Sequence, residues 1–168
     1  VYPTHGFGPV CMALNMHRGN KMTYLVSIDT KSVNGLEVGK KLLGVDEFLN
    51  GDHTTTLMRT ANGKVVEIQH NVMTPQPYNR LFKLTGTKGY ATKYPTPEYA
   101  LSGEALKGTD APQMDNLNAH GFINAEQKKA LEKKYYHPIL TKYGEKGRQM
   151  GHGGMDYIMD ARMVYCLQ

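Results

Sequence analysis

Tryptophan is absent from this chain of 168 residues, and cysteine occurs only twice, as Cys11 and Cys166. Two cysteines cannot build the multiple-disulfide framework that stabilises very small secreted domains. Both lie on apolar stripes of helix-like stretches, so the sequence predicts two buried free thiols. No apolar run is long enough to cross a membrane, which excludes a membrane-spanning segment in this stretch.

Several chemical motifs are also missing. Seven histidines are present, but none forms an HExxH pair or has a Cys-x-x-Cys partner, so local spacing predicts no metal site. The sequence contains no GxSxG nucleophile motif, no Walker loop and no GxGxxG dinucleotide fingerprint. A cradle for nucleotide phosphates is therefore not encoded in this stretch.

The net charge is +5, from 20 basic and 15 acidic residues. The densest basic stretch, residues 128–148, is interrupted by Glu132 and Glu145. This alternation is typical of a solvated helix face, whereas a nucleic-acid site would need uninterrupted basic residues with interleaved aromatic ones. We therefore expect no nucleic-acid partner.

The order of local patterns indicates an α+β fold in one domain over residues 1–168. Strands are grouped in the middle of the chain and helices at its ends, which favours a largely antiparallel sheet. The expected helices cover residues 9–17, 45–49, 124–136 and the segment after Gly153-Gly154, and the expected strands cover 22–29, 53–60, 64–72, 79–86 and 90–94.

Three local signals give these expectations their detail. Gly8-Pro9 is read as the N-cap and first residue of the first helix. Gly86 and Gly89 are expected to supply positive φ angles in a strand turn. Residues 95–121 are expected to be an irregular connection, and Pro138 to end the helix that begins at Asn124.

Tyr2 and His5 are the first candidate site residues. They lie three residues apart, just ahead of the expected first helix, whose positive end would disfavour imidazolium and keep His5 neutral near pH 7. A neutral histidine beside a tyrosine can handle protons. In the structural alternative Tyr2 packs against the helix and His5 lines a loop.

Two further stretches carry candidate binding residues. In TPQPYNR two prolines stiffen a loop that presents Tyr78 and Arg80, which suits binding of a polyol, although such a loop can simply connect strands. In GHGGMDY, His152 precedes two glycines and then Asp156. The alternative there is a flexible helix entry with a favourable acidic residue.

Taken together, several separated blocks resemble the C-terminal half of glycoside hydrolase family 109. The blocks are YPTHGFGPV, DHTTTLMRTANGKVVEIQHNV, TPQPYNR, LTGTKGYATKYP, YYHP and GHGGMDYIMDARMVYCL, in consistent order over nearly the whole chain. This family of NAD-dependent glycosidases includes α-N-acetylgalactosaminidase and lies within the glucose-fructose oxidoreductase/inositol dehydrogenase/MocA superfamily.

The resemblance implies an open, mostly antiparallel sheet with helices on one face, preceded by an NAD-binding Rossmann domain upstream of Val1. It also implies cleavage by transient oxidation of the sugar, elimination, hydration and re-reduction. Tyr2 and His5 match the Tyr-x-x-His of the sugar site and would be catalytic, while Tyr78, Arg80 and His152 would bind the sugar. NAD would be held mainly by the upstream domain, and the isolated chain would be inactive.

Alternatives remain open at this point. A sugar or polyol oxidoreductase of the same superfamily would share the fold and differ in the fate of the hydride. A non-catalytic oligomerisation or carbohydrate-binding module is a third possibility. The resemblance further implies a homo-oligomer with a carbohydrate substrate, and a location in the periplasm or cell envelope, with the cytoplasm as the alternative.

Overall fold

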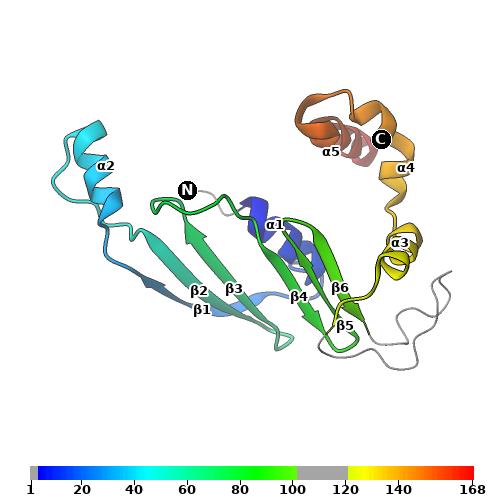
Figure 1. Ribbon diagram of the computed structural model, residues 1–168, viewed down its shortest axis with the longest axis horizontal. Helices are drawn as coiled ribbons and strands as arrows, with labels where there is room; N and C mark the ends of the chain where they lie inside the picture. Colours follow the sequence, from blue (N-terminus) through cyan, green and yellow to red (C-terminus); the bar gives the residue numbers. More distant parts are fainter. Residues whose placement is uncertain (1–3, 102–120) are drawn as a thin grey trace. The chain divides into compact units, whose positions relative to one another are not determined.

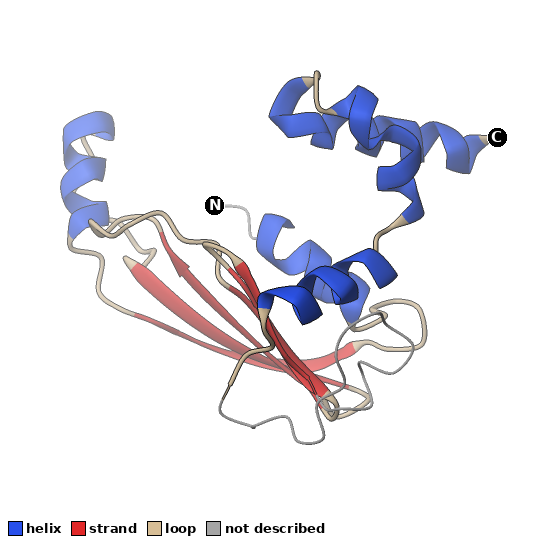
Figure 2. Cartoon of the chain, turned by 45° about the vertical axis from the view of Figure 1, so that its right-hand side comes forward, coloured by secondary structure: helices blue, strands red, loops and turns tan. Residues whose placement is uncertain are grey.

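The computed structural model describes residues 4–101 and 121–168. It is an α+β arrangement in which the six described strands pair antiparallel, as expected from the sequence. Figures 1 and 2 show the helices and strands along the chain. The chain forms two compact units, Val1–Arg80 and Leu81–Gln168. No helix in the described ranges is both long and apolar enough to cross a membrane.

The first unit contains a three-stranded sheet of order β1-β2-β3 with helices before and after its first strand. Asp29 at the end of the first strand pairs with Thr54, and Met58 in the middle strand pairs with Val66 in the third. Met58 and Val66 are both buried and form part of the small core. The elements are α1 (Thr4–Ala13), β1 (Met22–Asp29), α2 (Asn34–Leu43), β2 (His53–Thr60) and β3 (Val65–Asn71).

The hairpin between β2 and β3 confirms the turn predicted from Ala61-Asn62-Gly63. Gly63 has a φ of 77°, a conformation that glycine adopts without the steric cost that a Cβ brings. The side-chain oxygen of the buried Asn20 accepts hydrogen bonds from the backbone N–H groups of Lys21, at 3.0 Å, and of Asn62, at 3.3 Å. Asn20 thereby ties the segment before β1 to the hairpin turn.

The second unit contains the sheet β4-β5-β6 and the C-terminal helices. Its helix α3 begins with the predicted capping box. The backbone N–H of Gln127 donates to the Asn124 side chain at 2.9 Å, and the backbone N–H of Asn124 donates to the Gln127 side chain. The elements are β4 (Phe82–Gly86), β5 (Gly89–Lys93), β6 (Pro97–Leu101), α3 (Ala125–Lys134), α4 (Pro138–Gly147), the 3-10 turn η2 (Gly151–Gly154) and α5 (Met155–Leu167).

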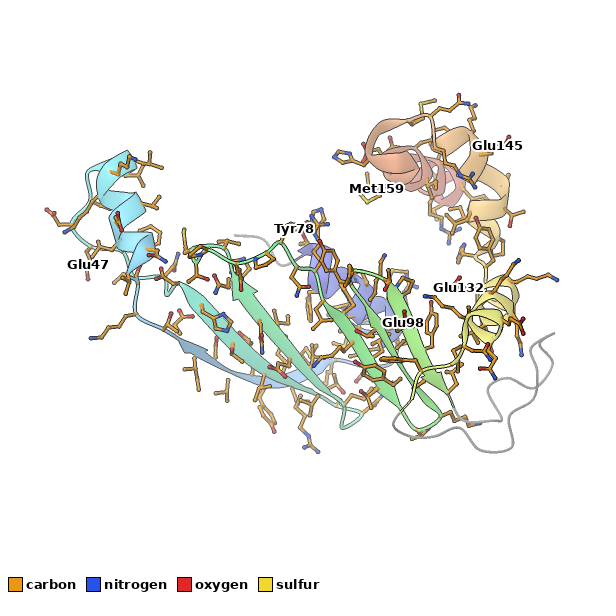
Figure 3. All side chains as sticks on the ribbon, in the orientation of Figure 1. Glu47, Tyr78, Glu98, Glu132, Glu145 and Met159 are labelled. Atoms are coloured by element: carbon orange, nitrogen blue, oxygen red, sulfur yellow. The ribbon has the colours of Figure 1, made fainter. Side chains whose placement is uncertain are left out.

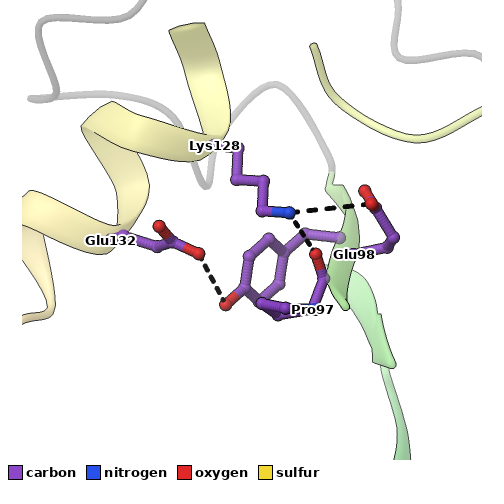
Figure 4. A network of polar contacts seen from close by, with 5 residues as sticks. Pro97, Glu98, Lys128 and Glu132 are labelled. Carbon is purple, nitrogen blue, oxygen red and sulfur yellow. Dashed lines mark hydrogen bonds and ion pairs between the residues drawn. The ribbon is translucent and has the colours of Figure 1, made fainter. Parts of the chain in front are cut away.

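A polar network joins α3 to β6 (Figure 4). The Lys128 ammonium lies 3.6 Å from the Glu98 carboxylate and also donates to the carbonyl of Pro97. One turn along the helix, the Tyr99 hydroxyl donates to Glu132 at 3.4 Å. Burial and the neighbouring Glu132 carboxylate raise the pKa of Tyr99. The network fixes the helix against the edge of its sheet.

Several boundaries predicted from the sequence are wrong. The first helix begins at Thr4, so Pro9 lies inside it although its ring nitrogen has no hydrogen to donate. Residues 45–49 are not helical, and the helix in that region is Asn34–Leu43. Pro138 does not merely end a helix, because it is the first residue of the next one.

Other corrections concern glycines, the connection after residue 95 and one thiol. Gly86 and Gly89 do not have positive φ angles. A Cβ on Gly89 would lie 2.6 Å from a Leu101 methyl carbon, so the glycine permits close strand approach. Residues 97–101 form β6, and residues 102–120 lie outside the described part of the chain. Both cysteines are free thiols, but neither is buried: Cys11 is half-buried, and Cys166 is exposed because the apolar stripe of α5 faces outward.

Candidate functional site

His5 lies in the first turn of α1 rather than ahead of the helix. Its side chain is exposed, and no acidic residue lies in that first turn. The backbone N–H groups of a helix's first turn carry partial positive charge, so this position suits a hydroxyl-bearing or anionic ligand. Tyr2, its proposed companion, lies outside the described residues.

Tyr78 and Arg80 are brought together by the loop between β3 and β4. The Arg80 guanidinium carbon lies 5.2 Å from the centre of the Tyr78 ring, within the range of a cation–π contact. Tyr78 is 64% exposed, and Figure 3 shows where it leaves the ribbon. An aromatic face beside a fixed cation can bind a ring that carries hydroxyl groups.

The approach to this pair is organised by Asn71 at the end of β3. Its side-chain oxygen accepts hydrogen bonds from the backbone N–H of Thr74 at 3.2 Å and from the Thr74 hydroxyl at 2.9 Å. The Gln76 amide donates to the Asn71 carbonyl at 3.2 Å. Two prolines in the same segment fix their φ angles. Hydrogen bonds to Asn71, a residue that the sequence analysis did not single out, thus order the first part of this loop.

His152 lies in the second unit, in η2 immediately before α5. Its Nδ1 is 2.8 Å from a carboxylate oxygen of Asp156. This hydrogen bond, together with the charge of Asp156, raises the pKa of His152. The spacing of four residues was visible in the sequence, but the pairing depends on the turn between them. Asp156 is therefore a functional candidate that the pattern alone presented only as a favourable helix residue.

A hollow of about 360 Å³ lies between α4 and α5 and contains none of the predicted site residues. The rings of Tyr143 and Tyr157 meet edge to face there, with centres 6.1 Å apart. Lys142 lies 5.0 Å from the Tyr143 ring centre, and Lys146 lies 5.5 Å from that of Tyr157. The contact between the two rings joins α4 to α5, so the cluster serves helix packing.

Backbone amides at three helix N-termini already have hydrogen-bond partners. The α2 amides are occupied by Asp52, the α3 terminus by its capping box, and the Ile139 N–H at the start of α4 donates to the His137 ring. Pyrophosphate binding needs such amides to be available. The occupied amides at these three termini therefore do not suit a pyrophosphate.

The whole chain, residues 1–168, matches the family model "Glycosyl hydrolase 109, C-terminal domain". It is 73% identical to "Glycosyl hydrolase family 109 protein 3" of Phocaeicola vulgatus, covering 100% of this chain and 31% of that protein. It is 54% identical to "Glycosyl hydrolase family 109 protein 1" of Bacteroides fragilis, covering 100% of this chain and 37% of that protein.

These matches cover the whole of this α+β chain and identify it as part of a glycosyl hydrolase. The chain belongs to glycosyl hydrolase family 109 and corresponds to its C-terminal domain. It spans about a third of the length of the curated relatives it matches.

Proposed function

We propose that this chain is the sugar-binding and proton-handling part of an NAD-dependent glycosidase that cleaves α-N-acetylgalactosaminide-like glycosides. The observation that carries the proposal is the match of every residue of the chain to the family's C-terminal domain. The dinucleotide would supply reversible hydride removal when bound. It would be held mainly by another part of the protein, and the occupied backbone amides at the starts of α2, α3 and α4 support this.

His5 and Tyr2 are the proposed proton-handling pair. The exposed position of His5 in the first turn of α1 supports this role, because a ligand can reach the ring and the helix amides lie nearby. A histidine can accept a proton from a sugar hydroxyl near neutral pH, and a tyrosine hydroxyl can share the hydrogen bond.

Tyr78, Arg80 and His152 are the proposed sugar-binding groups. The contact between Arg80 and the Tyr78 ring supports a platform for one face of a pyranose ring, whose C–H groups pack on an aromatic surface while its hydroxyls bond to a cation. His152 offers a ring nitrogen to a hydroxyl group. Tyr78 and Arg80 would orient the glycoside through ring packing and hydrogen bonding.

The proposal is tested by product analysis with a full-length family 109 protein that carries this domain. Incubation with an aryl α-N-acetylgalactosaminide and NAD should release the phenol and free N-acetylgalactosamine, without accumulation of NADH. Stoichiometric NADH and an oxidised sugar would instead identify a net oxidoreductase. Binding of the sugar without either product would identify a carbohydrate-binding module.

The roles of Tyr2 and His5 are tested by a double-mutant cycle in the same protein. If the two side chains share one hydrogen-bond network, the combined loss of activity in Tyr2→Phe with His5→Asn should be smaller than the sum of the two single losses. Strictly additive losses would separate the two residues and refute the pairing.

A further inference from the structure

The backbone around His152 has an unusual conformation. His152, Gly153 and Gly154 have φ angles of 53°, 65° and 99°, so three consecutive residues occupy the left-handed region. Glycine adopts this region freely, but a histidine does so at a steric cost. A residue kept in such a conformation is held there by its surroundings, and such residues cluster at functional sites.

Close packing against α4 holds this turn. Gly154 is buried, and a Cβ built on it would lie 2.6 Å from the carbonyl carbon of Gly147 at the end of α4. A Cβ on Gly147 would in turn lie 3.4 Å from the Gly154 Cα. The two glycines therefore allow the backbones of α4 and η2 to pack closely, and that contact fixes the position of the His152 side chain.

The side chain of His152 combines a fixed partner with open access. Among the described residues, Asp156 is the one hydrogen-bond partner of its ring, through Nδ1 at 2.8 Å. The His152 side chain is 75% exposed and that of Asp156 is 45% exposed. The pair is thus oriented by a short contact while the opposite edge of the ring faces outward.

We propose that Asp156 is a positioning residue that holds His152 with its proton on Nδ1, so that Nε2 accepts a hydrogen bond from a sugar hydroxyl. A carboxylate only accepts hydrogen bonds, so a neutral imidazole beside it must donate through Nδ1 and keep its lone pair on Nε2. The same arrangement orients histidines in metal and catalytic sites.

A sugar is the ligand class that this arrangement suits, and that part of the inference rests on the function proposed above. Hydroxyl groups donate as well as accept, so one can give its proton to Nε2 without a charged partner. The hydrogen bond and the charge of Asp156 raise the pKa of His152, so Nε2 accepts in the neutral ring above that pKa, whereas the imidazolium below it donates from both nitrogens.

The ring tautomer can be measured on this chain by two-bond proton–nitrogen NMR, independently of any enzyme activity. His152→Gln assigns the resonance among the seven histidines. The neutral wild-type ring should carry its proton on Nδ1, and Asp156→Ala should move the population toward Nε2–H. Asp160→Ala, which removes a carboxylate one turn further along α5, should leave the tautomer unchanged.

A purely structural role for Asp156 would not change how tightly substrate binds. In the full-length enzyme, Asp156→Ala should raise KM for the glycoside by about tenfold, the scale of one lost hydrogen bond, with a smaller change in kcat. Asp160→Ala should change neither.

Three results would overturn the inference. A wild-type proton on Nε2, or an unchanged tautomer in Asp156→Ala, refutes the positioning role whatever the enzyme does. An unchanged KM in an active Asp156→Ala enzyme refutes the contact with the sugar. An inactive wild-type enzyme refutes the proposed function and the sugar contact together, while the tautomer result still decides the positioning role.

Discussion

The carboxylate of Asp52 accepts a 2.8 Å hydrogen bond from the backbone N–H of Gly35, although the two residues are 17 positions apart. It also accepts from Asn34 at 2.9 Å and from Val33 at 3.0 Å. The first turn of α2 has no cap from its own segment. Asp52, in the loop before β2, therefore caps the N-terminus of α2 and connects α2 to β2.

The charge of Asp52 makes α2 sensitive to acid. The pKa of Asp52 lies below its ordinary value of 3.8. The hydrogen bond from the Gly35 N–H is the largest cause, and those from Asn34 and Val33 add to it. Burial acts in the opposite direction. Because the folded pKa is depressed, the stabilisation is complete above the unfolded pKa and disappears as pH falls through the folded one.

Asp52→Asn should therefore lower the melting temperature by a few degrees at about pH 7, and its difference from wild type should shrink below about pH 4. Thermal denaturation followed by circular dichroism at both pH values measures this. Asp46→Asn, an exposed aspartate in the neighbouring loop, is the matched control and should melt like wild type. A deficit in Asp52→Asn that does not change with pH would contradict the charged cap.

The contact between Gly147 and Gly154 predicts a large cost for a single methyl group. Gly154→Ala should destabilise the protein by about 1–3 kcal/mol, because the new Cβ strains a positive φ and meets the Gly147 backbone. Gly144→Ala, inside α4 with its nearest neighbours at 4.0 Å, should instead stabilise it by up to about 1 kcal/mol. Urea denaturation distinguishes the two, and equal effects would show that α4 and η2 do not pack in this way.

The contact between Arg80 and Tyr78 in the loop before β4 predicts a change in substrate binding without a change in stability. Arg80→Ala in the full-length enzyme should raise KM by about tenfold through loss of a charged hydrogen-bond donor, with little effect on kcat or melting temperature. Arg162→Ala removes a matched cation, which lies 5.2 Å from the Tyr165 ring, and should leave KM unchanged. A lower melting temperature with normal KM would make Arg80 a structural residue.

The occupied amides at the starts of α2, α3 and α4 predict that the isolated chain binds NAD only weakly. Titration calorimetry should give no saturable binding below about 1 mM, the range of weak non-specific contacts. A micromolar dissociation constant would show that residues of this chain form a dinucleotide site.

Local signals in the sequence predicted much of the fold. The strand over residues 22–29, the Asn-Gly hairpin, the capping box at Asn124 and the helix after Gly154 are all present. Each depends on interactions between residues that are close in the chain, such as a turn that needs a positive φ. The α+β class followed from their order.

The errors arose where distant residues decide the local structure. The start of α2 could not be predicted because its cap, Asp52, lies on another segment. Gly89 was assigned to a turn, although its role is to admit Leu101 of the neighbouring strand. For the candidate site, the sequence selected His152, but the function of Asp156 depends on a left-handed turn that spacing alone does not show.

The most direct test of the proposed function is the turnover number of His5→Asn in a full-length family 109 enzyme acting on an aryl α-N-acetylgalactosaminide. The exposed position in α1 predicts a normal circular dichroism spectrum and melting curve, with turnover reduced by about 10²–10⁴-fold, the scale for loss of a general acid or base. His17→Asn is the control, since Asn tolerates the φ of 61° at that exposed position and should keep wild-type turnover. Wild-type turnover in His5→Asn with a lower melting temperature would contradict the catalytic assignment and make His5 a structural residue.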